Sequence, residues 1–184
     1  SIRKDDDFIG MVLEGLKENG LWENTIVVYF GDHGANQLLR HKQMPTEGGL
    51  HVPFVVCGPE KYVPRKKVRK DLAWAGIPIP GNWEGQDLFG KGFKAREFVA
   101  SAKDRLDHTI DRVRTIRTER YRYTRNFKTD RIFLQPQYRD GQPYTQDFHD
   151  LYNAGKLSAR HAEIYFGERP AEEFYDVEND PAQM

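Results

Sequence analysis

The sequence has little cysteine, no long apolar run and no net charge. Its single cysteine, Cys57, excludes an intrachain disulfide and leaves the redox compartment open. No stretch approaches the roughly 18 apolar residues of a membrane-spanning helix, and the N-terminus has no apolar signal core. The 28 basic residues are balanced by 28 acidic ones, so no overall charge directs the chain to nucleic acid or to a membrane surface. We therefore predict neither nucleic acid nor a membrane as a partner.

The first part of the chain has the pattern of an α/β protein. Residues 5–19 carry apolar side chains at helical spacing between an acidic start and the helix-ending pair Asn19–Gly20, which predicts an amphipathic helix. Residues 25–30 (TIVVYF) and 52–58 (VPFVVCG) are apolar and rich in β-branched side chains. We predict strands there, the first of them central and covered on both faces. Helix, strand, loop and strand together predict the α/β fold class.

The rest of the chain changes in character. Residues 59–96 are basic at first and then rich in Gly and Pro, which is typical of an irregular connection. The residues after Arg169 are polar and predict turns rather than a regular element. Between these segments we expect strands at 97–103, 112–118 and 120–127, with a hairpin turn near Glu119, and helices at 143–154 and 158–166.

Asp32 and His33 lie just past the first predicted strand, at the end where ligands collect in open α/β sheets. Gly31 and Gly34 flank them and permit a sharp turn with a close approach of the backbone to a bound group. A carboxylate oxygen and an imidazole nitrogen can share a divalent cation. The spacing equally allows a simple turn in which Asp32 caps the backbone and His33 is exposed. Two ligands are too few for a metal site, so its other ligands would come from elsewhere.

Arg40, His41 and Lys42 form a run of basic residues in the loop between the two strands. A lysine ammonium can hold a sulfate or phosphate group as a point charge. A solvated basic loop is the alternative. Because Gly48 and Gly49 then turn the chain into the second strand, the lysine and the metal candidates share one strand–loop–strand unit. We predict that they form a joint site.

The order of these motifs resembles the sulfatases of the alkaline phosphatase superfamily. The matching segments are ENTIVVYFGDHG, the loop lysine, EGGLHVPFVV, AGIPIP, EGQDLFG, DRVRTIRTERYRYTRNF and RPAEEFYDVENDPAQM. Their series is similar to the C-terminal portion of a sulfatase, especially of the bacterial relatives of heparan N-sulfatase (sulfamidase). The resemblance implies that residues 1–58 are part of a mixed-sheet α/β sandwich. Residues 59–96 would connect it to a smaller antiparallel α+β subdomain, residues 97–184.

The resemblance also implies roles for individual residues. Asp32 and His33 would bind the active-site cation, which is calcium in most sulfatases; Mg²⁺, Mn²⁺ and Zn²⁺ stay open because a histidine fits calcium imperfectly. Lys42 would bind the sulfate and stabilise charge on the transferring group. Substrate contacts are expected from Arg40, His41 and His108. The implied activity is hydrolysis of a sulfate ester or N-sulfate on a small molecule or a sulfated carbohydrate, in the periplasm or outside the cell.

The family's nucleophile is a formylglycine, made from Cys or Ser in a Cys/Ser-x-Pro/Ala-x-Arg motif that does not occur in these residues. Cys57 is followed by GPEK and lacks the arginine, so we interpret it as strand packing. We expect the formylglycine in an N-terminal half that these residues do not include. By itself, this chain is then expected to be inactive. It would need the N-terminal half of the fold, or association with other chains. Two alternatives stay open. One is a phosphodiesterase or phosphonate monoester hydrolase of the same superfamily, and the other is a non-catalytic fragment or binding module.

Residues 112–131 hold eight basic side chains interleaved with aromatic ones. This pattern could bind nucleic acid, and some of the arginines could recognise a sulfated sugar. We favour a structural interpretation, in which arginine stems cover one face of a sheet and pair with nearby carboxylates.

Overall fold

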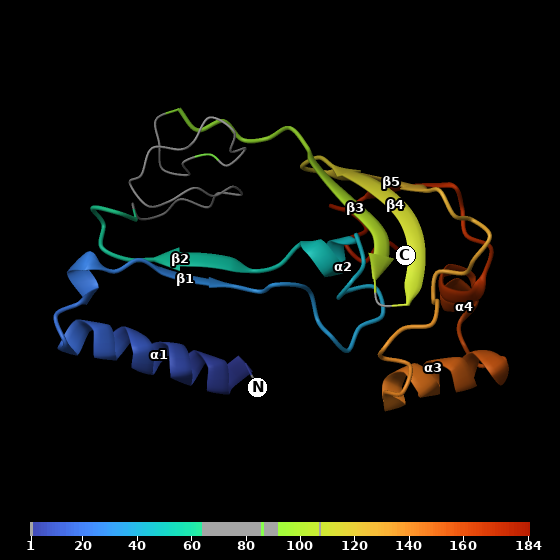
Figure 1. Ribbon diagram of the computed structural model, residues 1–184, viewed down its shortest axis with the longest axis horizontal. Helices are drawn as coiled ribbons and strands as arrows, with labels where there is room; N and C mark the ends of the chain where they lie inside the picture. The colour runs from blue at the N-terminus through green and yellow to red at the C-terminus, as the bar shows by residue number, and fades with distance from the viewer. Residues whose placement is uncertain (1, 64–85, 87–91, 107) are drawn as a thin grey trace. The chain divides into compact units, whose positions relative to one another are not determined.

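The computed structural model describes residues 2–63, 86, 92–106 and 108–184, which divide into two compact units (Figure 1). The first unit contains the residues up to Phe30 together with residues 53–95, and the second contains residues 31–52 together with 96–184. All candidate site residues lie in the second unit. Most of the predicted connection at 59–96 lies outside the described residues, and the domain boundaries at 58 and 96 stay a prediction.

The first unit opens with helix α1 (Ile2–Glu18), which confirms the predicted amphipathic helix and begins it three residues earlier. Gly20 ends it with φ +69, a conformation that favours glycine, and the amide of Leu21 donates to the Leu16 carbonyl at 2.9 Å. A 3₁₀ turn, η1 (Trp22–Asn24), follows. Among the described helices, none has the length and apolar character needed to cross a membrane.

Strands β1 (Val27–Phe30) and β2 (Phe54–Cys57) confirm the two predicted apolar strands. They pair antiparallel, with Val27 opposite Cys57 and Phe30 opposite Phe54. The prediction that β1 is central and covered on both faces is wrong for the described residues, because no third strand joins this sheet there. Phe30 is 58% exposed and Val55 is 55% exposed. An apolar run indicates a strand whose faces would be buried by other elements, but it does not show which elements bury them.

The second unit is built on a four-stranded antiparallel sheet in the order β3-β4-β5-β6. Strands β3 (Val99–Leu106), β4 (Thr109–Arg117) and β5 (Tyr121–Asn126) confirm the three predicted strands and the hairpin. Strand β6 (Glu172–Asp176) was not expected, because its sequence EEFYD is acidic and poor in β-branched residues. It forms because it pairs along β5, where Tyr121 lies opposite Asp176 and Arg125 opposite Glu172. Tertiary pairing here outweighs local propensity.

Helices α3 (Pro143–Asn153) and α4 (Ala159–Phe166) also confirm their predictions, and the Ser158 hydroxyl caps α4 by accepting from the His161 amide at 3.2 Å. A small apolar core joins these helices to two other segments. Its buried residues are Leu39, Leu134 and Tyr165, surrounded by Phe133, Tyr144, Phe148, Ile164 and Phe166. Leu39 belongs to residues 31–52, which we call the site loop. The site loop is therefore packed into the core of the second unit.

The arginines of the basic hairpin pair with carboxylates, as the structural interpretation predicts. Arg114 holds Asp104 through two bonds of 2.7 and 3.0 Å, and Arg131 pairs with Asp130 at 2.7 Å. Other partners come from distant sequence, such as Asp176, which accepts from Arg120 at 2.6 Å.

Candidate functional site

The site loop closes on itself through close backbone contacts at glycines. The amide of Gly34 donates to the carbonyl of Gly49 at 3.3 Å. A Cβ atom at Gly34 would lie 1.6 Å from the Gly48 carbonyl oxygen, and one at Gly48 would lie 2.6–2.8 Å from ring atoms of His41. A side chain at Gly34 would require the loop backbone to move, and one at Gly48 would require the His41 ring to shift. The glycines that the sequence places around Asp32 and before β2 therefore bring the two ends of the loop together.

Asp32 and His33 lie side by side at the start of the loop. The His33 Nδ1 lies 2.6 Å from the Gly34 carbonyl oxygen, which can only accept, so Nδ1 carries the proton in this arrangement. The other ring nitrogen, Nε2, lies 3.5 Å from the Asp32 Oδ2, and the Asp32 side chain is 82% exposed. In the neutral ring, Nε2 and the Asp32 carboxylate would present a lone pair and a carboxylate oxygen side by side, as cation binding requires.

The metal candidates remain a pair in the part of the chain that the structure describes. No cluster of three or more His, Cys, Asp or Glu side chains suited to a metal ion occurs there. One nitrogen and one carboxylate group fit a divalent cation in type, but they do not complete a coordination shell.

Lys42 is half-buried, and an aromatic ring holds its ammonium. The Nζ atom lies 5.5 Å from the centroid of the Tyr138 ring, within the range of a cation–π interaction. Among the described residues, no carboxylate forms an ion pair with this lysine. Within the described part of the chain, the positive charge is therefore held against a ring without being neutralised, which suits the binding of an anion.

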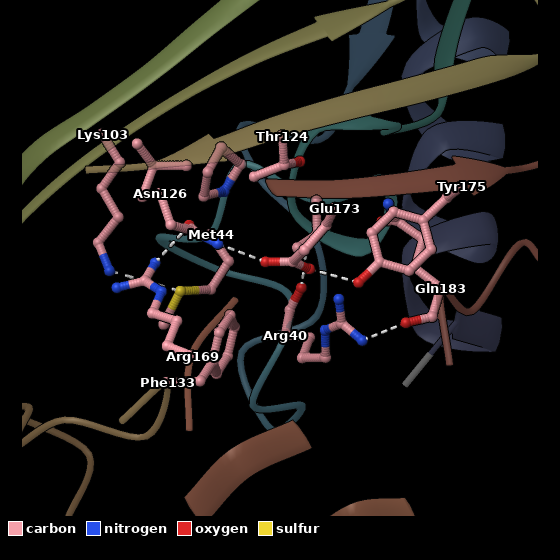
Figure 2. A pocket seen from close by; sticks show the side chains of 13 residues that line it. Arg40, Met44, Lys103, Thr124, Asn126, Phe133, Arg169, Glu173, Tyr175 and Gln183 are labelled. Carbon is pink, nitrogen blue, oxygen red and sulfur yellow. Dashed lines mark hydrogen bonds between the residues drawn. The ribbon is translucent and has the colours of Figure 1, made fainter. Parts of the chain in front are cut away.

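Arg40 and His41 precede Lys42 but face different surroundings. Arg40 is buried, donates to the Gln183 carbonyl and lies 5.5 Å from the Phe133 ring centroid (Figure 2). Burial and the neighbouring Arg40 charge both lower the pKa of His41, which favours the neutral ring. His108 is exposed in the turn between β3 and β4, and no hydrogen bond or ion pair of the described residues joins it to the site loop.

Figure 2 shows the polar contacts around a small cavity of about 20 Å³ beside Arg40. Lys103 and Arg169 both pair with the buried carboxylate of Asp111, at 3.3 and 2.9 Å. Burial lowers the pKa of Lys103, and the charge of Asp111 opposes that effect. Asp111 thus bridges two buried cations, and Arg169 also donates to the Asn126 side-chain oxygen at 2.9 Å, so we interpret this cluster as structural.

A larger cleft of about 610 Å³ adjoins the loop. It is lined by the stretch from Gln37 to His41, by side chains of α3 and α4, and by residues 181–184. Aromatic rings of Tyr144, Phe148 and Tyr165 contribute to its walls. The basic side chains that line it are Arg40, His41 and His161, with no Asp or Glu among the described lining residues. This volume and this charge suit a neutral or anionic ligand of moderate size.

Sequence reasoning missed the residues that hold the loop in place. Glu47 accepts hydrogen bonds from Arg117 and Arg122 of the sheet, and Arg139 binds carbonyl groups of the loop. Glu47 stands in the motif EGG, which was recognised only for its glycines. No local pattern marks Tyr138 or Arg139, which lie about 100 residues from the loop they contact.

Comparison with known proteins agrees with the motifs. Residues 1–73 match the family model Sulfatase. Over its whole length, the chain is 30% identical to one ulvan-active sulfatase of Formosa agariphila and 29% identical to a second. The arylsulfatase K of Bos taurus is 31% identical over 98 residues, which are 45% of this chain and 18% of that protein. The chain covers only 33% and 37% of the two ulvan-active sulfatases. These matches confirm the resemblance to the C-terminal portion of a sulfatase.

Proposed function

We propose that the intact protein hydrolyses a sulfate ester or N-sulfate on a carbohydrate. The observation that carries this proposal is Lys42, an ammonium group held on the site loop without a carboxylate partner among the described residues. A fixed positive charge binds sulfate and stabilises the negative charge that develops as the sulfuryl group transfers. The nucleophile would come from polypeptide outside these 184 residues, because the formylglycine motif does not occur in them.

Asp32 and His33 would supply two ligands to an active-site cation. The position of the His33 Nε2 beside the exposed carboxylate of Asp32 supports this assignment, and the remaining ligands would lie outside the described residues. Calcium remains our expectation from the family, and the histidine leaves Mg²⁺, Mn²⁺ and Zn²⁺ open. When bound, the cation would polarise the sulfate oxygens. Lys42 would then orient the same group through its ammonium hydrogens.

The cleft beside the loop would hold the carbohydrate. It shares His41 with the basic run that contains Lys42, and its aromatic walls and lack of Asp or Glu among the described lining residues suit an anionic sugar. Gln37→Glu would place a carboxylate in this cleft. We expect it to weaken the binding of a sulfated oligosaccharide at least about threefold and to leave the binding of a small aryl sulfate unchanged. Asn153→Asp, an equal charge change on the exposed end of α3, is the control.

The choice of sulfate over phosphate is tested with matched esters of one alcohol. The intact protein should hydrolyse the sulfate ester with the higher kcat/KM. A preference for the phosphate diester would instead favour a phosphodiesterase. Saturable binding of sulfated carbohydrate without turnover of either ester would identify a binding module.

A further inference from the structure

Arg139 is buried against the site loop and binds its backbone at three places. Its guanidinium donates to the carbonyl oxygens of Asn36 at 2.9 Å, Leu38 at 3.4 Å and Lys42 at 3.3 Å. The Gln137 side-chain oxygen accepts two further hydrogen bonds from the guanidinium, at 3.1 and 2.7 Å, and Arg139 is only 1% exposed. Five N–H donors in one rigid plane make this set of contacts, which a lysine cannot reproduce. Arg139 thus gives this irregular stretch the partners that a helix or sheet would supply elsewhere.

The backbone turn at Gln43 explains why the loop needs such support. Gln43 has φ +74, in the left-handed region that non-glycine residues rarely adopt. Such conformations persist where the surrounding structure holds them, and they cluster at functional sites. The Lys42 carbonyl that accepts from Arg139 belongs to the peptide that joins Lys42 to Gln43. The Arg139 guanidinium therefore contacts the very turn that sets the direction of the Lys42 side chain.

Tyr138 acts on the other end of the same lysine. Its ring lies 5.5 Å from the Lys42 Nζ, and its hydroxyl donates to the Asn36 side-chain oxygen at 3.0 Å. A carboxylate in this place would fix the ammonium but would also neutralise it and compete with a bound anion. An aromatic face attracts the ammonium while leaving its hydrogens free to be donated.

We infer that Tyr138 and Arg139 are positioning residues for Lys42, Arg139 through the loop backbone and Tyr138 through the ammonium. This inference rests on the proposed function, because it assigns a task to the lysine of the proposed sulfate site. It assigns a role to Tyr138 and Arg139, which no sequence motif marks. It also explains why, among the described contacts, an aromatic ring lies against the Lys42 ammonium.

The test measures how tightly inorganic sulfate, as a competitive inhibitor, binds to variants of the intact protein. Tyr138→Leu removes the ring and should raise the inhibition constant of sulfate about fivefold. Tyr138→Phe keeps the ring, and its inhibition constant should stay within about twofold of the wild-type value. Arg139→Lys should also weaken sulfate and should lower kcat more than it raises KM, because the loop geometry is disturbed. A merely structural role would not separate Tyr138→Leu from Tyr138→Phe.

Two matched controls separate positioning from stability. Tyr121 is a partly exposed tyrosine with a cation, Arg120, 5.1 Å from its ring centroid, and Arg169 is a buried arginine with several bonds. Neither contacts Lys42 in the described structure, so Tyr121→Leu and Arg169→Lys should leave the sulfate inhibition constant unchanged, whatever they cost in Tm. If the Tyr138 and Arg139 variants bind sulfate no more weakly than these controls, the inference is overturned.

A second readout keeps this inference apart from the proposed function. The lysine side chains are labelled by reductive ¹³C-methylation, and the Lys42 signal is followed by NMR. The ring of Tyr138 should shift this signal; the shift should persist in Tyr138→Phe and vanish in Tyr138→Leu. The shift could vanish in Tyr138→Leu as expected while Lys42→Ala leaves the affinity for sulfate unchanged. This result would confirm the contact between Tyr138 and Lys42 but reject the proposed sulfate site. A signal that does not respond to Tyr138→Leu would reject the positioning itself.

Discussion

Glu47 of the site loop and Arg117 of β4 form an ion pair in which Nε lies 2.8 Å from Oε1. Arg122 of β5 donates to the same carboxylate oxygen at 3.1 Å, and its Nη1 donates to the Pro45 carbonyl at 3.1 Å. Glu47 and Arg122 are both buried. The end of the loop that leads into β2 is thus fixed to the four-stranded sheet by a charged contact.

Replacing Glu47 with Gln should destabilise the protein. The variant keeps the shape of the side chain but leaves Arg117 and Arg122 without their counter-charge. Removing one member of a buried charged pair is costly because the other member stays desolvated. We expect the free energy of unfolding to fall by about 2 kcal/mol, measured by urea titration of the intact protein at neutral pH. Asp104→Asn, which removes the exposed partner of Arg114, is the control and should cost well under half as much.

The same contact predicts a dependence on acid. Burial of Glu47 opposes its ionisation, but hydrogen bonds from Arg117 and Arg122 outweigh that effect and lower its pKa from 4.5 to about 2. Because the pKa is lower in the folded state than in the unfolded state, the stabilisation is complete above pH 4.5 and is lost as the pH falls toward 2. The difference in Tm between wild type and Glu47→Gln should therefore shrink over this range. A difference that is constant from pH 6 to pH 3 would show that the charge of Glu47 is not what matters.

Asp32 provides a test of the cation. Asp32→Ala should lower the affinity of the intact protein for its divalent cation at least about tenfold, because one of few charged ligands is lost. The measurement is the metal content after dialysis against buffers of known free Ca²⁺ or Mn²⁺. Asp6→Ala removes an exposed carboxylate from α1 and serves as the control. Equal metal content in wild type and Asp32→Ala would instead support the alternative interpretation, in which Asp32 and His33 form a turn that binds no metal.

The sequence predicts the elements whose pattern is local. Apolar side chains at helical spacing and a glycine at its end predict α1, and alternating residues around a short turn predict the hairpin of β4 and β5. The positions of Asp32, His33 and Lys42 in one strand–loop–strand unit are also read from the sequence, and their roles in a site stay a prediction. Strand β6 could not be predicted, because an acidic segment becomes a strand only beside β5.

The supports of the loop escaped prediction for a similar reason. Arg139 and Tyr138 reach the loop only after the chain has folded through the sheet and toward α3. The sequence likewise predicts Arg40 as a substrate contact because it stands beside Lys42. In the structure its side chain is buried and donates to the Gln183 carbonyl, a partner 143 residues away. Neighbours in sequence thus face different surroundings, and because Arg40 also lines the cleft beside the loop, its role as a substrate contact stays a prediction.

The central claim is that Lys42 binds and stabilises the sulfate during hydrolysis. The most direct measurement is kcat/KM for a sulfate ester with the intact wild-type protein, Lys42→Ala and Lys17→Ala. Lys17 is the matched control, because its Nζ also lies over an aromatic ring, 5.6 Å from the centroid of Trp22 in the first unit. We predict a loss of about 100-fold or more for Lys42→Ala and no change for Lys17→Ala. Hydrolysis by Lys42→Ala within a few-fold of wild type would remove this lysine from the site and contradict the account.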